Sequence, residues 1–95
     1  MFRIQKAFED DRTIIFSVAG KITDDQIDVW SQEITGIAQK EKEHLILNFC
    51  SLAFISAKAL KVLTDSLSRR VHIMNCSVYV RNLLHASGST VIFLD

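Results

Sequence analysis

The feature that most constrains the fold is a repeated change of period along the chain. Short apolar segments with the spacing of strands alternate with longer segments whose apolar residues recur at helical spacing. At the start, 2–8 and 14–18 alternate apolar and polar side chains on either side of the polar residues 9–12. This pattern predicts two strands joined by a tight turn. Further strands are predicted at 44–49, 71–74 and 90–94.

Each predicted helix begins at a residue that can cap it and carries one apolar stripe. The residues predicted to bound the helices are Thr23, Asp24 and Gln26 for the first, Ser56 for the second, and Asn75 or Ser77 with Gly88 for the third. The stripes predicted to be buried are Ile27, Trp30, Ile34, Ile37 and Ala38, then Leu60, Leu63 and Leu67, then Tyr79, Val80, Leu83 and Leu84. Gly20 is predicted to end the second strand, and 50–55 to be a loop.

Strands that alternate with helices of about 12 to 15 residues require crossover connections, which are right-handed and place the strands in a largely parallel sheet. The sequence therefore predicts an α/β fold with the order ββαβαβαβ and helices packed on the sheet. A chain of 95 residues is too short for two independent cores. We expect a single domain over 1–95.

Charge and hydropathy narrow the class of protein further. Eleven Lys and Arg residues balance eleven Asp and Glu residues, so no field of one sign is available to attract nucleic acid. The apolar runs are far shorter than the roughly 20 residues that cross a bilayer, which argues against membrane insertion. The first residues lack the pattern of a signal peptide, so a cytoplasmic location is expected. There Cys50 and Cys76 are expected to be small core or half-buried residues, not a disulfide framework.

Catalytic motifs are missing from the sequence. Its three glycines form neither a dinucleotide fingerprint nor a phosphate-binding loop, and there is no nucleophile elbow. The residues that chemistry of this kind would use are His44, His72, His85, Cys50 and Cys76, but their spacing fits no compact zinc site. No ordered triad is apparent either. We therefore predict no catalytic residues, no metal site, no cofactor and no enzyme activity.

The most informative stretch, from Asn48 to Leu63, resembles the signature of the STAS family, the sulfate-transporter and anti-sigma-factor-antagonist domain. In that family a strand ends in Asp-Leu-Ser-Gly, an aromatic residue and Ile follow, and a helix begins with Asp-Ser-Ser-Gly-Leu or Ser-Ser-Ala-Gly-Leu. Placed without gaps, the matching positions are 48–51, Phe54, Ile55 and Leu60. The segment 20–23 resembles the family's turn before its first helix, and the order of predicted elements agrees along nearly all of the chain.

The departures from the motif concern its polar chemistry. In family members that are switched by phosphorylation, the acceptor is the Ser that follows the residue starting the helix, and this position is Ala57. The resemblance therefore implies that the usual phosphoacceptor is missing. Ser56 is a weaker alternative acceptor, because a Ser at that place more commonly caps its own helix. Lys58 and Ala59 replace a small residue and Gly, and Asn48 replaces an acidic residue.

A phosphate in the first turn of a helix is tolerated by the domain itself, because it meets free amides and the positive end of the helix dipole. The phosphate instead disrupts the docking of a partner protein at that helix. With Ala57 in place, the surface is expected to stay in its unmodified, binding-competent form. The residues expected to bind a partner are Ser51, Ser56, Ala57, Lys58 and Lys61. The two lysines either meet an acidic partner surface or belong to an ordinary solvated helix face.

The resemblance implies a non-enzymatic, cytoplasmic, bacterial protein-binding domain of the anti-sigma factor antagonist type. Such a domain binds an anti-sigma factor or a serine kinase-like protein and so affects sigma-dependent transcription. The alternative is a STAS-type structural subunit of a membrane-associated lipid-transport ATPase or of a signalling complex. A nucleotide-binding role finds no motif in the sequence. The last predicted strand, which ends at Leu94, leaves a sheet edge or apolar groove that a second copy would fill as a homodimer.

Overall fold

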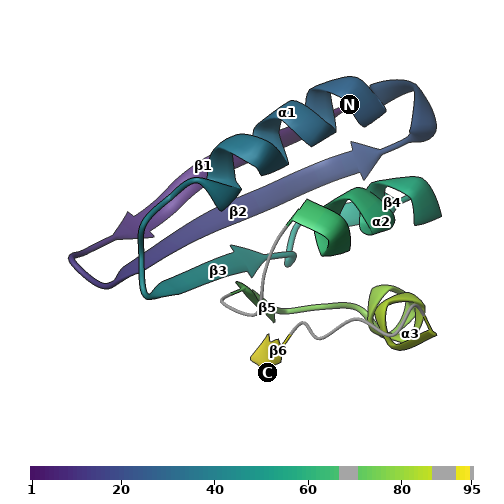
Figure 1. Ribbon diagram of the computed structural model, residues 1–95. Helices are drawn as coiled ribbons and strands as arrows, with labels where there is room; N and C mark the ends of the chain where they lie inside the picture. The colour runs from purple at the N-terminus through teal and green to yellow at the C-terminus, as the bar shows by residue number, and fades with distance from the viewer. Residues whose placement is uncertain (67–70, 87–91, 95) are drawn as a thin grey trace.

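The computed structural model describes residues 1–66, 71–86 and 92–94. These residues form a mixed sheet and three α-helices (Figure 1). The elements are β1 (Phe2–Glu9), β2 (Thr13–Ile22), a 3₁₀ turn (Asp24–Gln26), α1 (Ile27–Ala38), β3 (His44–Asn48), β4 (Leu52–Ile55), α2 (Ala57–Ser66), β5 (Val71–Met74), α3 (Val78–Ala86) and β6 (Ile92–Leu94). None of these helices is long and apolar enough to span a membrane.

The predicted α/β class is confirmed, and the sheet is mostly parallel. Its strands lie in the order β1-β2-β3-β5-β6, with β4 paired to β2 outside this path. Among the described strands, β1 and β2 form an antiparallel hairpin, and β2 with β3, β2 with β4, β3 with β5 and β5 with β6 are parallel. The compact α/β architecture therefore follows the prediction, with one additional strand.

The prediction of a loop at 50–55 was wrong, because Leu52–Ile55 forms β4. The prediction that β2 ends at Gly20 was wrong for the same reason: β2 continues to Ile22, and this extension is the partner of β4. Gly20 has a φ of +92°, and the register between the two strands shifts there. The observed order is therefore ββαββαβαβ.

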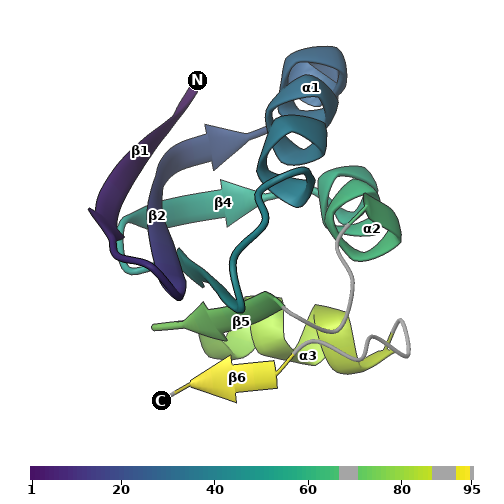
Figure 2. The same cartoon turned by 60° about the vertical axis from the view of Figure 1, so that its left-hand side comes forward.

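All three helices pack on one face of the sheet. The strands β2, β3, β5 and β6 follow one another in one direction across the sheet, and right-handed crossovers then place every helix on the same side. Figure 2 shows α1 beside α2, with α3 next to β5 and β6. Side-chain contacts also place α3 on this face. Phe93 of β6 lies on the same face as the buried Ile73, and it contacts Arg81 and His85 of α3.

The core lies between this face and the helices. Ile14, Phe16 and Val18 of β2 alternate with less buried residues, as expected for a strand covered on one side. The predicted stripe of α1 is confirmed: Trp30, Ile34 and Ile37 are buried, and Ile27 and Ala38 pack at the edge of the core. The other buried side chains are Ile22, Leu45, Leu47, Phe49, Ile55, Ala59, Leu60, Leu63, Val71, Ile73, Val80 and Leu84.

Two expectations about burial were wrong. Tyr79, predicted to lie on the buried stripe of its helix, is 53% exposed, because Val80 and Leu84 already fill the space toward the sheet. Cys50 is exposed on the surface, while Cys76 is half-buried as expected. Other predicted features, Leu67, Gly88 and the start of the last strand at 90–91, lie outside the described residues.

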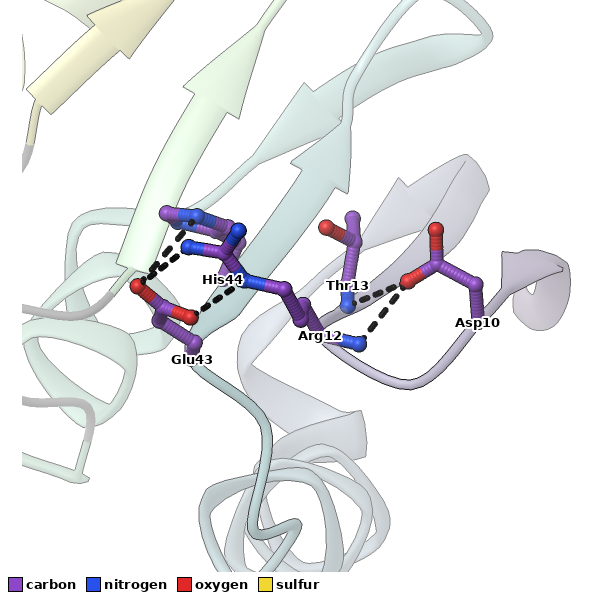
Figure 3. Close-up of polar contacts among 5 residues, drawn as sticks. All are labelled: Asp10, Arg12, Thr13, Glu43 and His44. Atoms are coloured by element: carbon purple, nitrogen blue, oxygen red, sulfur yellow. Dashed lines mark hydrogen bonds and ion pairs between the residues drawn. The ribbon is translucent and has the colours of Figure 1, made fainter.

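Polar contacts hold the hairpin turn to the loop before β3 (Figure 3). The carboxylate of Asp10 accepts hydrogen bonds from the backbone N–H groups of Arg12 and Thr13, which lower the pKa of Asp10. Arg12 donates from Nε and Nη2 to the two carboxylate oxygens of Glu43, at 2.6 and 2.8 Å, and this contact lowers the pKa of Glu43. The pair is exposed, so it orients the two loops and adds little to stability.

Replacing Gly20 with alanine is expected to lower the free energy of unfolding by about 2 kcal/mol. A Cβ at this position would lie 2.4 Å from the carbonyl oxygen of Met1, in a backbone conformation that side chains disfavour. The matched control is Gly36→Ala on α1, where a Cβ meets nothing within 4 Å. That change should raise stability by up to about 1 kcal/mol. Urea unfolding of both variants measures the two effects. Equal free energies of unfolding for Gly20→Ala and Gly36→Ala would contradict the requirement for glycine at position 20.

Candidate functional site

The start of α2 is held in place by the pairing of β4 with β2. Ile55, the last residue of β4, is fully buried opposite Ile22. The next backbone N–H, that of Ser56, donates to the carbonyl oxygen of Ile22 at 2.9 Å. This ladder continues to the residue before the helix, so the position of the first turn of α2 is set by the sheet.

Ser56 caps α2. Its Oγ accepts a hydrogen bond from the N–H of Ala59 at 3.2 Å, and its carbonyl oxygen accepts from the N–H of Leu60 at 3.0 Å. The predicted N-cap is therefore confirmed. The side chain of Ser56 is half-buried, and its hydroxyl is occupied by its own helix.

Replacing Ser56 with alanine should lower the free energy of unfolding by about 1 kcal/mol, because the Ala59 N–H loses its partner. Chemical denaturation measures the loss. Ser51→Ala is the matched control, since the Ser51 side chain is exposed and its hydroxyl forms no hydrogen bond with the described residues. A stability of Ser56→Ala within error of Ser51→Ala would contradict the capping role.

The other residues proposed from the sequence lie on the surface of α2, with one exception. Ala57 is the first residue of the helix and is exposed. Lys58, the next residue, and Lys61, one turn after Ala57, are exposed as well. Lys61 forms an ion pair with Asp65 at 3.3 Å. Ser51 is also exposed, but it lies before β4, whose four residues, roughly 13 Å of strand, stand between it and Ser56. The structure thus brings Ser56, Ala57, Lys58 and Lys61 together and separates Ser51 from them.

The first turn of α2 is also anchored from below by α1. The indole of Trp30 is fully buried, and its Nε1–H donates to the carbonyl oxygen of Ala59 at 2.9 Å. Ala59 has no exposed surface, so a small side chain lets the two helices approach closely. Trp30 was predicted from the sequence as a core residue, and its bond to the helix that carries the site is an additional role.

A groove of about 270 Å³ runs between α2 and α3 beside these residues. Its lining consists of Ala57, Leu60, Lys61, Thr64, Asp65 and Leu83. On α3, Tyr79 lies one turn before Leu83 on the same side of the helix, and Val78 and Tyr79 are 72% and 53% exposed. Sequence reasoning missed Tyr79 as a surface residue. The sequence did contain a signal that Tyr79 would be exposed. Val80 and Leu84, four residues apart, are enough to form the buried stripe of a helix this short.

The loops after β3 and β5 meet at the same edge of the sheet. Asn48 Oδ1 accepts hydrogen bonds from the Cys50 N–H at 2.9 Å and from Asn75 Nδ2 at 3.0 Å, and Asn75 has a φ of +58°. The asparagine at position 48 therefore fastens both loops. Burial raises the pKa of the Cys76 thiol. In the part of the chain that the structure describes, no three His, Cys, Asp or Glu side chains converge as metal ligands would.

Comparison with known proteins gives matches at the level of structure. No family model matches the sequence, and no curated protein sequence matches it. The structure of the anti-sigma factor antagonist SpoIIAA in its unphosphorylated form is similar, with a TM-score of 0.71 and 17% identity, covering 98% of this chain and 88% of that one. An anti-sigma factor antagonist from Mycobacterium paratuberculosis has a TM-score of 0.74 and 17% identity, covering 93% and 79%.

A third similar structure is the Bacillus cell fate determinant SpoIIAA in its phosphorylated form, with a TM-score of 0.61 and 21% identity, covering 98% of this chain and 90% of that one. These identities are low, and the agreement lies in the arrangement of strands and helices along almost the whole chain. The structure therefore has the fold of these anti-sigma factor antagonists.

Proposed function

We propose that this chain is a non-enzymatic regulatory domain that binds a protein partner in the manner of an anti-sigma factor antagonist. The partner is an anti-sigma factor or a related serine kinase-like protein, and binding it affects sigma-dependent transcription in a bacterial cytoplasm. The fold carries the first part of this proposal, since three similar structures are those of anti-sigma factor antagonists or of SpoIIAA.

The observation that carries the docking site is the exposed first turn of α2. Ala57 offers a methyl group at the position where the STAS motif has its phosphoacceptor, and the neighbouring Ser56 hydroxyl bonds to its own helix. SpoIIAA has been described in both phosphorylated and unphosphorylated forms. We infer that the present chain remains in the state that corresponds to the unphosphorylated one, so that its activity is set by the amount of protein and partner.

The groove between α2 and α3 supplies the rest of the docking surface. Its lining combines apolar Ala57, Leu60 and Leu83 with polar residues of α2, and the exposed Tyr79 lies one turn before Leu83 on α3. Exposed aromatic side chains next to an apolar groove are typical of the residues that contribute most to protein interfaces. Lys58 stands exposed on α2 near this groove, while Lys61 is paired with Asp65, so Lys58 is the cation that favours a partner with acidic residues around an apolar contact.

Binding of a purified anti-sigma factor of the serine-kinase type, from the cell that encodes this chain, tests the proposal by calorimetry. Lys58→Glu should weaken binding about tenfold through repulsion of an acidic partner surface. Lys40→Glu is the matched control, because it makes the same charge change just after α1, at the opposite end of the sheet, and should leave affinity unchanged. No binding by the unmodified chain would contradict the proposed partner, and equal effects of the two variants would contradict the surface.

A further inference from the structure

The second face of the sheet is covered by none of the described helices. Because all three crossovers fall on one side, the residues that alternate with the core point to the other side. The strand register places Phe8, Ile15 and Ile46 side by side across β1, β2 and β3. Met74 and Leu94 form a second apolar pair across β5 and β6. Phe8 is 48% exposed and Leu94 40%, and the other three are half-buried.

This arrangement is unusual for a sheet of mainly parallel strands. Parallel sheets are almost always covered on both faces, whereas sheets with one face in water carry polar residues on that face. Here the large apolar side chains of Phe8, Ile15 and Ile46 form a row across β1, β2 and β3, and the next position in that row, on β5, is His72. Such a patch indicates a surface that is buried in an assembly.

The charges on this face favour a second copy of the same chain as its cover. At the paired positions of β1, β2, β3, β5 and β6 on this face there is no Asp or Glu; Arg3, near the start of β1, is the one Lys or Arg, and the polar rings of His44 and His72 lie beside Ile46. The apolar centre therefore suits an equally uncharged surface, because a charged partner would lose hydration there without gaining an opposite charge. The whole chain also has a formal net charge of zero, which favours self-association over mutual repulsion.

The size of the face sets the expected strength of such a contact. Five strands spaced about 4.8 Å apart, with a mean length of roughly 20 Å, present on the order of 500 Å² per copy. Two such faces bury about 1,000 Å², which is just enough for a specific interface and below that of a stable dimer. We propose that this chain forms a weak, reversible homodimer through its open sheet face, with Phe8, Ile15 and Ile46 at the centre. The groove between α2 and α3 stays free for the partner.

Sedimentation equilibrium of the full chain across a hundredfold range of concentration tests the dimer, whose dissociation constant we expect to be on the order of 10 to 100 μM. Phe8→Lys should raise that constant at least tenfold, and because Phe8 is half exposed the variant should fold. Ile46→Lys is a second variant at the centre of the face, and thermal melting reports whether each variant is folded. Val29→Lys on α1, which replaces an apolar side chain 55% exposed on the helical side, is the matched control.

Reversible dimerisation that Phe8→Lys or Ile46→Lys weakens and Val29→Lys leaves intact would support the proposal. A wild-type chain that stays monomeric over the whole range would overturn it. Dimerisation that Val29→Lys abolishes, or that both open-face variants retain, would place the contact elsewhere and would also overturn it. Neither result bears on binding of an anti-sigma factor at α2, so the two proposals fail independently.

Discussion

Replacing Trp30 with alanine is expected to lower the free energy of unfolding by about 3 to 5 kcal/mol, a large part of the stability of a small domain. The indole, which projects from α1, is fully buried between β1 and α2. Its ring packs edge-on against that of Phe2, with the ring centroids 5.4 Å apart, and its N–H donates a hydrogen bond to the carbonyl oxygen of Ala59. Truncation leaves a cavity and removes the link between α1 and the first turn of α2. Chemical denaturation followed by circular dichroism gives the loss.

A second variant separates packing from the hydrogen bond. Trp30→Phe keeps an aromatic ring in the core but leaves the Ala59 carbonyl without the indole donor, and should cost about 1 to 3 kcal/mol. Tyr79→Ala is the control for loss of an aromatic residue, and because Tyr79 is mostly exposed it should change stability by less than about 0.5 kcal/mol. A loss for Trp30→Ala no larger than that for Tyr79→Ala would contradict the central position of Trp30.

Replacing Ala57 with glutamate is expected to weaken binding of the anti-sigma factor by on the order of tenfold to a hundredfold, while stability stays the same or rises slightly. A carboxylate in the first turn of α2 is favourable to the helix, because it faces free N–H groups and the positive end of the dipole. The same charge lies on the exposed surface where the proposed partner would dock, and it would repel an acidic partner. Calorimetric titration and a thermal melt of the same sample measure both effects.

The serine variant at this position tests directly the proposal that Ala57 stands where a phosphoacceptor would be. Incubated with the kinase-type partner and ATP, Ala57→Ser should gain phosphate on the new hydroxyl, located by mass spectrometry of peptides. Wild type should gain none, and the double variant Ser56→Ala with Ala57→Ser should gain as much as Ala57→Ser alone. Substantial phosphate on Ser56 of the wild type would show that the capping hydroxyl is available to a kinase after all.

Much of the fold was predictable because its signals are local. The stripe of Trp30, Ile34 and Ile37 repeats at helical spacing, and the strand at 44–48 is a continuous apolar run, so each could be recognised within one short window. The Ser56 cap was predictable for the same reason, because the residue that bonds to it is only three positions away. The similarity of 48–60 to the STAS motif depended on the same stretch of chain.

What escaped prediction depended on distant partners. The four residues of β4 look like a loop until Gly20 lets β2 continue to Ile22 and pair with them. Tyr79 and Val80 are neighbours in one helix, and only the position of α3 on the sheet decides which of them is buried. In the candidate site, the separation of Ser51 from Ala57 by β4 was hidden for the same reason.

The amino-acid sequence by itself determined the periods of the strands and helices, the cap at Ser56 and the methyl group of Ala57, because each is a property of neighbouring residues. Only the tertiary structure decided that every helix lies on one side of the sheet, that Trp30 holds the start of α2, and that Phe8, Ile15 and Ile46 form one row on the open side. These are matters of register between strands and of the hand of the crossovers, and both are set by contacts between residues far apart in the chain.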